Sequence, residues 1–205
     1  MTIEQRLAEL KIVLPHAAAP AANYVPTVLH GGLLHISGQI PFDADGALIR
    51  GRIGDTMTTK EGEAAAQRCA IGLLAQMQSA LGSLDKVARV VKLGVFVNST
   101  ADYTDHPKVA NGASDLMKAV FGDIGQHARA AVGVASLPLG VPVEVEAIFA
   151  AYEAALLRND NDTLARMFLE RPETVRYGLN DVQHGYAEVL AFRATQTPFE
   201  RKLDR

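Results

Sequence analysis

At residues 143–149 the chain reads VEVEAIF, in which every odd-numbered residue is apolar. Alternation with a period of two predicts a strand with one buried face, because successive side chains of a strand point to opposite sides of the sheet. The apolar side chains are expected to face helices, which places Glu144 and Glu146 together on the opposite face. A carboxylate in so apolar a strand needs a partner, so this strand is the first candidate for a functional site.

The preceding predicted strand, ARAAVGV at residues 128–134, supplies a cation. Arg129 shares its side of the strand with Ala131 and Gly133, whose small size leaves open space beside the guanidinium group. We expect Arg129 and Glu144 to lie on the same face of the sheet, next to this pocket. Two interpretations stay open. One is a structural ion pair with either of the two glutamates, across neighbouring strands or a subunit interface. The other is a planar fork that holds the carboxylate of a ligand. The small neighbours favour the second.

The rest of the pattern predicts an α+β fold. Two apolar runs separated by Gly31-Gly32 indicate a β-hairpin. Further elements are expected at residues 59–81 (a helix with a capping box at its start), 87–97 (a buried strand) and about 107–120 (a second helix). Together they predict one mixed sheet with two helices packed on one face. We expect the other face to be covered by another copy of the chain.

The composition narrows the class of protein. Lys and Arg total 20 against 23 Asp and Glu, a formal net charge of -3, and no basic run is present, so we expect no nucleic acid partner. The sequence contains no apolar stretch of about 20 residues, so we expect no membrane span. The single Cys69 is interpreted as a buried thiol, and its isolation indicates a cytoplasmic protein. The histidines lack metal-site spacing, so we expect no metal and no cofactor.

The quoted stretches also resemble a known family. Three further stretches belong to the same resemblance: Tyr24-Val25, SGQIP at residues 37–41 and LP at residues 137–138. The resemblance extends from about residue 20 to 150. In this order and spacing they resemble the reactive intermediate deaminase (RidA) family. The resemblance implies a homotrimer of chorismate-mutase-like subunits. It also implies sites between subunits that hydrolyse amino-acid-derived enamines and imines to 2-oxo acids and ammonia, without metal or cofactor.

The resemblance also implies roles for individual residues. Arg129 would hold the carboxylate of a small-molecule substrate, and Glu144 would position or activate the attacking water. The expected substrate-binding residues are Tyr24 (from the neighbouring subunit), Ser37, Gly38, Asn111 and Ala131. The expected activity is that of a 2-iminobutanoate/2-iminopropanoate deaminase-like hydrolase.

One departure from the family leaves a second function open. The best-known members carry Cys where this chain has Ala131, and often Ser where it has Ala130. The missing thiol removes a contact in the expected pocket. The alternative is therefore a catalytically silent trimer that binds 2-oxo acids. A ribonuclease activity, also attributed to the family, is disfavoured by the acidic charge balance.

The character of the chain changes after Tyr152. NDND at residues 159–162 interrupts the pattern, and a strand is expected around residues 174–177. This tail faintly resembles the opening of an AtzH-like domain of the nuclear-transport-factor class. We therefore expect a RidA-like domain at residues 1–152. The extension at residues 153–205 is expected to be partial, AtzH-like and mostly helical, with too few residues to form a core of its own.

Overall fold

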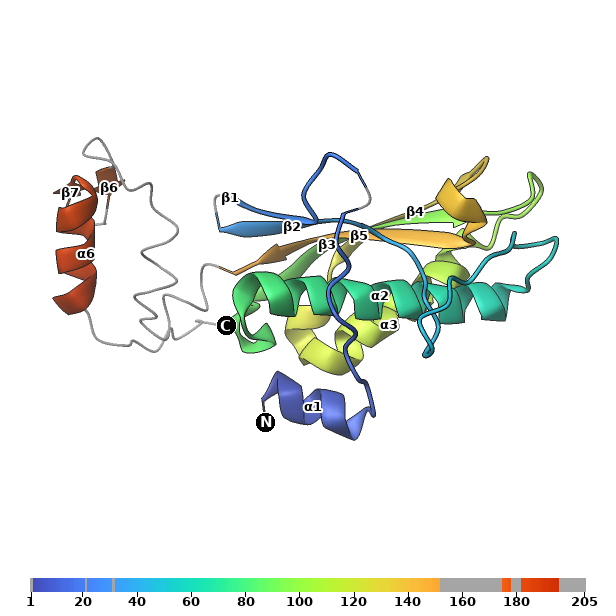
Figure 1. The fold of residues 1–205 in the computed structure, drawn as a ribbon, viewed down its shortest axis with the longest axis horizontal. Coiled ribbons are helices and arrows are strands. Elements are labelled where there is room, and N and C mark those ends of the chain that lie inside the picture. The colour runs from blue at the N-terminus through green and yellow to red at the C-terminus, as the bar shows by residue number, and fades with distance from the viewer. Residues whose placement is uncertain (1, 21, 31, 152–174, 178–181, 196–205) are drawn as a thin grey trace.

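The computed structural model describes residues 2–20, 22–30, 32–151, 175–177 and 182–195 (Figure 1). The elements of the main body are α1 (Ile3–Glu9), β1 (Thr27–His30), β2 (Leu33–Gln39), α2 (Thr59–Leu81), β3 (Arg89–Asn98), α3 (His106–Phe121), β4 (Ala128–Val134) and β5 (Val143–Ala150). Three short 3-10 helices lie at Leu84–Lys86, Gly122–Gly125 and Pro138–Gly140.

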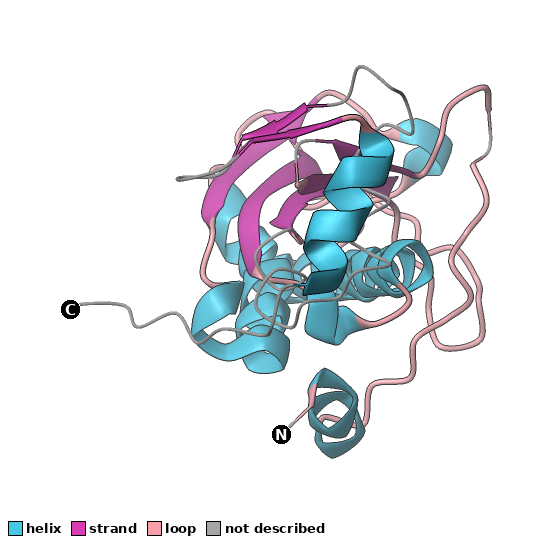
Figure 2. Cartoon of the chain, turned by 90° about the vertical axis from the view of Figure 1, so that its left-hand side faces the viewer, coloured by secondary structure: helices cyan, strands magenta, loops and turns pink. Residues whose placement is uncertain are grey.

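The main body is a five-stranded mixed sheet in the order β1-β2-β5-β3-β4. β3 and β4 are parallel, and the other neighbouring pairs are antiparallel. Helices α2 and α3 lie together on one side of the sheet (Figure 1, Figure 2). The predicted α+β class, with two helices on one face of a mixed sheet, is confirmed.

The alternation at residues 143–149 sets the two faces of the sheet as predicted. Val143, Val145 and Phe149 are fully buried against the helices. Glu144 is half-buried and Glu146 is exposed on the other side. We call this second side, which no described helix covers, the open face. It carries exposed apolar side chains, with Val28 at 48% and Val132 at 46% exposure.

Helix α2 begins and ends where the sequence signals predict. The Thr58 side chain accepts from the backbone N–H of Glu61, whose carboxylate accepts in turn from the N–H of Thr58. Gly82 ends the helix in the left-handed conformation, at φ 74°. This capping box and glycine cap satisfy backbone groups that the helix termini leave unpaired.

The packing of α3 against α2 depends on a glycine. A Cβ atom added at Gly112 would overlap the backbone carbonyl oxygen of Glu63 in α2 and would lie 2.8 Å from its carbonyl carbon. Because backbone cannot move aside as a side chain does, we expect Gly112→Ala to lower the free energy of unfolding by about 1–3 kcal/mol. Urea unfolding at one fixed protein concentration measures this change.

Gly72, in the middle of α2, is the matched control for this substitution. The three atoms nearest to a Cβ atom there all belong to the side chain of Gln39, at 3.3 Å or more. Alanine is also the better helix former, so Gly72→Ala is expected to stay within about 1 kcal/mol of the parent chain. Equal losses at the two positions would contradict the close approach of the two helices.

The described part of the tail contains a small hairpin and one helix. β6 (Val175–Tyr177) pairs antiparallel with β7 (Val182–His184), and α6 (Tyr186–Thr195) follows. The strand expected around residues 174–177 is therefore present, whereas β7 was not predicted. The interruption at residues 159–162 lies outside the described residues.

Candidate functional site

The strand register places Arg129 and Glu144 on opposite faces of the sheet. Arg129 is paired with Leu93, which is fully buried under the helices, so Arg129 lies on the helix side of the edge strand β4. Glu144 is paired with Phe96 on the open face. The expectation that Arg129 and Glu144 share a face is wrong, because a period of two separates the faces of a strand without saying which one meets the helices.

Arg129 is anchored to α3 by three hydrogen bonds. Its Nη1 donates to Asn111 Oδ1 at 3.0 Å and to Ser114 Oγ at 3.0 Å, and its Nη2 donates to the carbonyl of Pro107 at 3.4 Å. Within the described residues it forms no ion pair with Glu144 or with another carboxylate. The interpretation of Arg129 as the partner of a glutamate within one chain is therefore wrong.

The anchored guanidinium keeps two donors for a ligand. It carries five N–H groups, of which Nη1 uses both of its own and Nη2 uses one. No described residue accepts from the Nε–H or from the second Nη2–H. These two donors suit the two oxygens of a carboxylate. Arg129 is exposed, so an incoming molecule has access to it.

The space beside Arg129 is more filled than the sequence suggested. A Cβ atom at Gly133 would overlap the imidazole of His106, whose Nε2 also lies 3.1 Å from Ser99 Oγ. Ala131 is half-buried and packs against the hydrophobic core. Part of the expected pocket next to these two small residues is thus occupied by the chain itself, because His106, the first residue of α3, lies beside Gly133.

Glu144 lies over a glycine on the open face. A Cβ atom at Gly38 would overlap the carboxylate of Glu144, so a larger residue at position 38 would force this carboxylate to move. Burial raises the pKa of Glu144 above its ordinary 4.5, and the negative charge of Glu146 raises it further. No hydrogen bond from a described residue reaches the carboxylate. A half-buried, unpaired carboxylate with a raised pKa is suited to accept a proton.

Ser37 and the loop that carries Tyr24 lie on the same part of the sheet as Glu144. Ser37 Oγ donates to the carbonyl of Val25 at 3.0 Å, and its backbone N–H donates to Pro26 at 3.0 Å. Tyr24, the residue before Val25, is 49% exposed. The structure therefore brings Ser37, Gly38 and Glu144 together with the Tyr24 loop. Arg129 and Ala131 on β4 form a separate group with Asn111 on α3.

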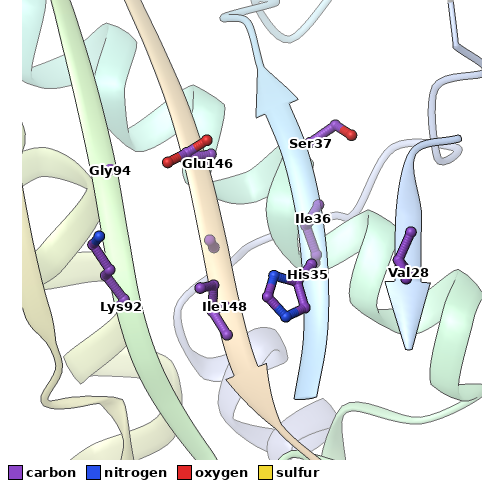
Figure 3. A pocket seen from close by; sticks show the side chains of 9 residues that line it. Val28, His35, Ile36, Ser37, Lys92, Gly94, Glu146 and Ile148 are labelled. Carbon is purple, nitrogen blue, oxygen red and sulfur yellow. The ribbon is translucent and has the colours of Figure 1, made fainter. Parts of the chain in front are cut away.

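A hollow of about 250 Å³ lies on the open face, between β2, β5 and β3. Figure 3 shows Ser37 and His35 on β2, Glu146 and Ile148 on β5, and Lys92 on β3. Of Tyr24, Ser37, Gly38 and Glu144, only Ser37 lines the hollow. Arg129 does not line it. In the described part of the chain, this hollow thus does not bring the two expected catalytic residues together.

Three polar residues near Arg129 were not identified from the sequence. Ser114 joins Arg129 to His127, and His106 lies over Gly133. Ser114 lies three residues after Asn111, on the same side of a helix, which is the signal that could have found it. The two histidines carry no such signal, because only the tertiary fold brings them to the strand. Among the described residues, no His, Cys, Asp and Glu group has the arrangement of a metal site.

The comparisons with known families give two matches. A model of the family described as "YjgF/chorismate_mutase-like, putative endoribonuclease" matches residues 4–151. A model described as "AtzH-like" matches residues 138–205. The second match overlaps β5 and continues through the tail.

Among the described residues, no helix has the length and apolar character needed to cross a lipid bilayer.

Individual relatives cover nearly the same part of the chain. Protein TCP17 from Trypanosoma cruzi is 54% identical over 147 residues, which are 71% of this chain and 92% of that protein. Protein HMF1 from Saccharomyces cerevisiae is 30% identical over 139 residues, 68% of this chain and 92% of that protein.

Two solved structures share the fold of the main body. A protein of unknown function from Agrobacterium tumefaciens has a TM-score of 0.67 at 43% identity, covering 73% of this chain and 94% of its own. A protein from Shewanella oneidensis, described as a "putative endoribonuclease", has a TM-score of 0.71 at 32% identity. The similarity covers 73% of this chain and 99% of that protein.

Proposed function

Because the chain belongs to the YjgF/chorismate mutase-like family, we propose that it hydrolyses enamines and imines derived from amino acids to 2-oxo acids and ammonia. The observation that carries this proposal is the anchored guanidinium of Arg129 with two N–H donors left over. Such a fork recognises a substrate by its carboxylate, which every 2-amino-acid imine retains.

The proposed reaction needs one water molecule and no nucleophilic side chain. Arg129 holds the carboxylate, which fixes the position of the adjacent C=N carbon. Once its nitrogen is protonated, this carbon is electrophilic. Glu144 takes a proton from the water as its oxygen bonds to the carbon, giving a carbinolamine. Glu144 returns its proton to the nitrogen, and the C–N bond breaks to release ammonia. The hydroxyl group loses its proton to the ionised Glu144 as the C=O bond of the 2-oxo acid forms, and Glu144 then releases this proton to solvent. An enamine first takes a proton on carbon to become the imine.

Tyr24, Ser37 and Gly38 are proposed to line the substrate site beside Glu144, and Asn111 and Ala131 to line it beside Arg129. The short distance from Asn111 to Arg129 supports a role for Asn111 in orienting the guanidinium. Ala131 favours the second candidate function, a silent trimer that binds 2-oxo acids, because it offers no thiol to a ligand. The net charge of -3 gives no support to RNA as the substrate.

The site is proposed to form between subunits of a homotrimer. Arg129 and Glu144 lie on opposite faces of the sheet, so one chain does not present both to a single ligand. The exposed Val28 and Val132 on the open face support its burial against another copy. We also propose a cytoplasmic location. Residues 153–205 are proposed to be an AtzH-like extension outside this site.

Imines made in solution test the activity. An amino-acid oxidase releases imines from a panel of amino acids, and their loss is followed with and without the protein. Faster imine loss, with 2-oxo acid and ammonia in equal amounts, supports the deaminase. Saturable binding of 2-oxobutanoate without faster imine loss would support the silent trimer instead. Cleavage of RNA that survives Arg129→Ala would contradict the proposed role of the site.

A mixing experiment tests whether the site is shared. We expect Arg129→Ala and Glu144→Gln chains to be nearly inactive alone. After joint unfolding and refolding at equal amounts, about a quarter of shared sites would combine an intact Arg129 with an intact Glu144. Imine hydrolysis should therefore return to about a quarter of the parent activity. If each site belonged to one chain, mixing would restore nothing.

A further inference from the structure

The contacts of Arg129 continue inward to a histidine that the proposed reaction does not use. Ser114 Oγ, which accepts from Arg129, lies 3.0 Å from Nε2 of His127. Nδ1 of the same ring lies 2.6 Å from the carbonyl oxygen of Gly125. The His127 side chain is half-buried between α3 and the 3-10 helix at Gly122–Gly125. Both of its ring nitrogens are thus engaged within the chain.

The carbonyl of Gly125 fixes one proton of the ring, and the charge of the ring decides the direction of the bond to Ser114. Arginine can only donate, so the Ser114 oxygen accepts from it. The Ser114 hydroxyl keeps its own proton, and Nε2 of His127 is an acceptor within reach, at 3.0 Å. Nδ1 must carry a proton for the carbonyl of Gly125. In the neutral ring Nε2 is then unprotonated and accepts from Ser114, whereas in the imidazolium it would donate to Ser114.

The surroundings of His127 favour the neutral ring. Burial lowers its pKa below 6.5, and the positive charge of Arg129 lowers it further, while the hydrogen bond to Gly125 acts in the opposite direction. The groups that meet the ring from α3 and from the 3-10 helix are the neutral hydroxyl of Ser114 and the neutral carbonyl of Gly125. A neutral imidazole at neutral pH keeps the acceptor that Ser114 needs.

We propose that Ser114 and His127 are positioning residues that fix the guanidinium plane of Arg129 for a ligand carboxylate. The inference rests on the proposed function, in which Arg129 holds the substrate. Arg129 lies on an edge strand and is exposed, so its own packing does not fix its rotation. The bond from Ser114 to His127 turns the Ser114 lone pair toward Nη1. Together with Asn111, it directs the unused Nε–H and Nη2–H edge outward.

Two substitutions of His127 separate positioning from packing. In His127→Gln the longer carboxamide can place its oxygen near the former Nε2 and still accept from Ser114. In His127→Asn the shorter carboxamide reaches only the Gly125 carbonyl, so Ser114 loses its acceptor. We expect His127→Gln to keep kcat/KM within about 3-fold of the parent enzyme and His127→Asn to lower it by about 10-fold. The Kd for 2-oxobutanoate should rise by a similar factor in His127→Asn.

Ser114→Ala should match His127→Asn, and the double variant should be no worse than either, because both changes break the same connection. Additive losses, or equal activity of His127→Gln and His127→Asn, would overturn the proposal. The unfolding midpoints of all variants are measured as well, so a loss of fold is recognised separately.

Nitrogen-15 NMR of the histidine rings tests the connection without any turnover. We expect His127 to carry its proton on Nδ1, and the Nε2 signal to move in Ser114→Ala. A proton on Nε2 would overturn the inference whatever the activity. If the parent chain neither hydrolyses imines nor binds 2-oxobutanoate, the proposed function fails, while the NMR result still decides how His127 and Ser114 are connected.

Discussion

Replacing Arg129 with lysine is expected to lower kcat/KM for imine hydrolysis by about 100-fold or more. Lysine keeps the positive charge, but its single ammonium cannot bond Asn111, Ser114 and Pro107 while presenting two parallel donors to a carboxylate. The substrate would bind in several orientations, few of which bring the C=N carbon to the attacking water. Steady-state kinetics with imines generated in solution measure the loss.

Arg68→Lys is the matched control for this substitution. Arg68 also links two elements through its guanidinium, donating from α2 to the carbonyls of Phe42 and Asp43. Arg68 lies outside the group around Glu144 and outside the group around Arg129. The activity of Arg68→Lys should therefore stay within about 3-fold of the parent enzyme. Both variants should keep the oligomeric state. Near-normal turnover by Arg129→Lys would rule out the carboxylate-binding role.

The fold could be predicted closely because its signals are local. The strands expected at residues 128–134 and 143–149 agree with the bounds in the structure to within one residue. The long helix begins at its capping box and ends at Gly82. Each of these features depends on residues a few positions apart, where period, capping and turn chemistry act together.

The geometry of the candidate site depended on information that local patterns do not contain. In ARAAVGV both faces of the strand carry small or apolar residues, so the pattern did not show that Arg129 lies on the helix side. That assignment follows from the parallel pairing of β4 with β3 and from α3 above it. The contacts that connect Arg129 to His127 likewise depend on three elements together: β4, α3 and the 3-10 helix at Gly122–Gly125.

Glu144→Gln is expected to lower kcat by about 100- to 10,000-fold, since the amide can still hold a water molecule but cannot take its proton. Glu146→Gln is the matched control: Glu146 lies two residues away on the same face of β5 and is exposed. It should keep activity at neutral pH within about 3-fold of the parent enzyme. Equal losses in the two variants would remove the special role of Glu144.

The Glu146→Gln variant is also expected to shift the dependence of activity on pH. Glu144 acts as a base only when ionised, so activity should fall as the pH decreases through its pKa, which burial and the charge of Glu146 hold above 4.5. Glu146→Gln removes that negative charge, so ionisation of Glu144 becomes easier and its pKa decreases. The acid limb of kcat/KM should therefore move to lower pH in Glu146→Gln. The imine itself titrates identically for both enzymes, so the difference between the two profiles reports on the protein. An acid limb that stays in place, or moves to higher pH, would show that another group accepts the proton.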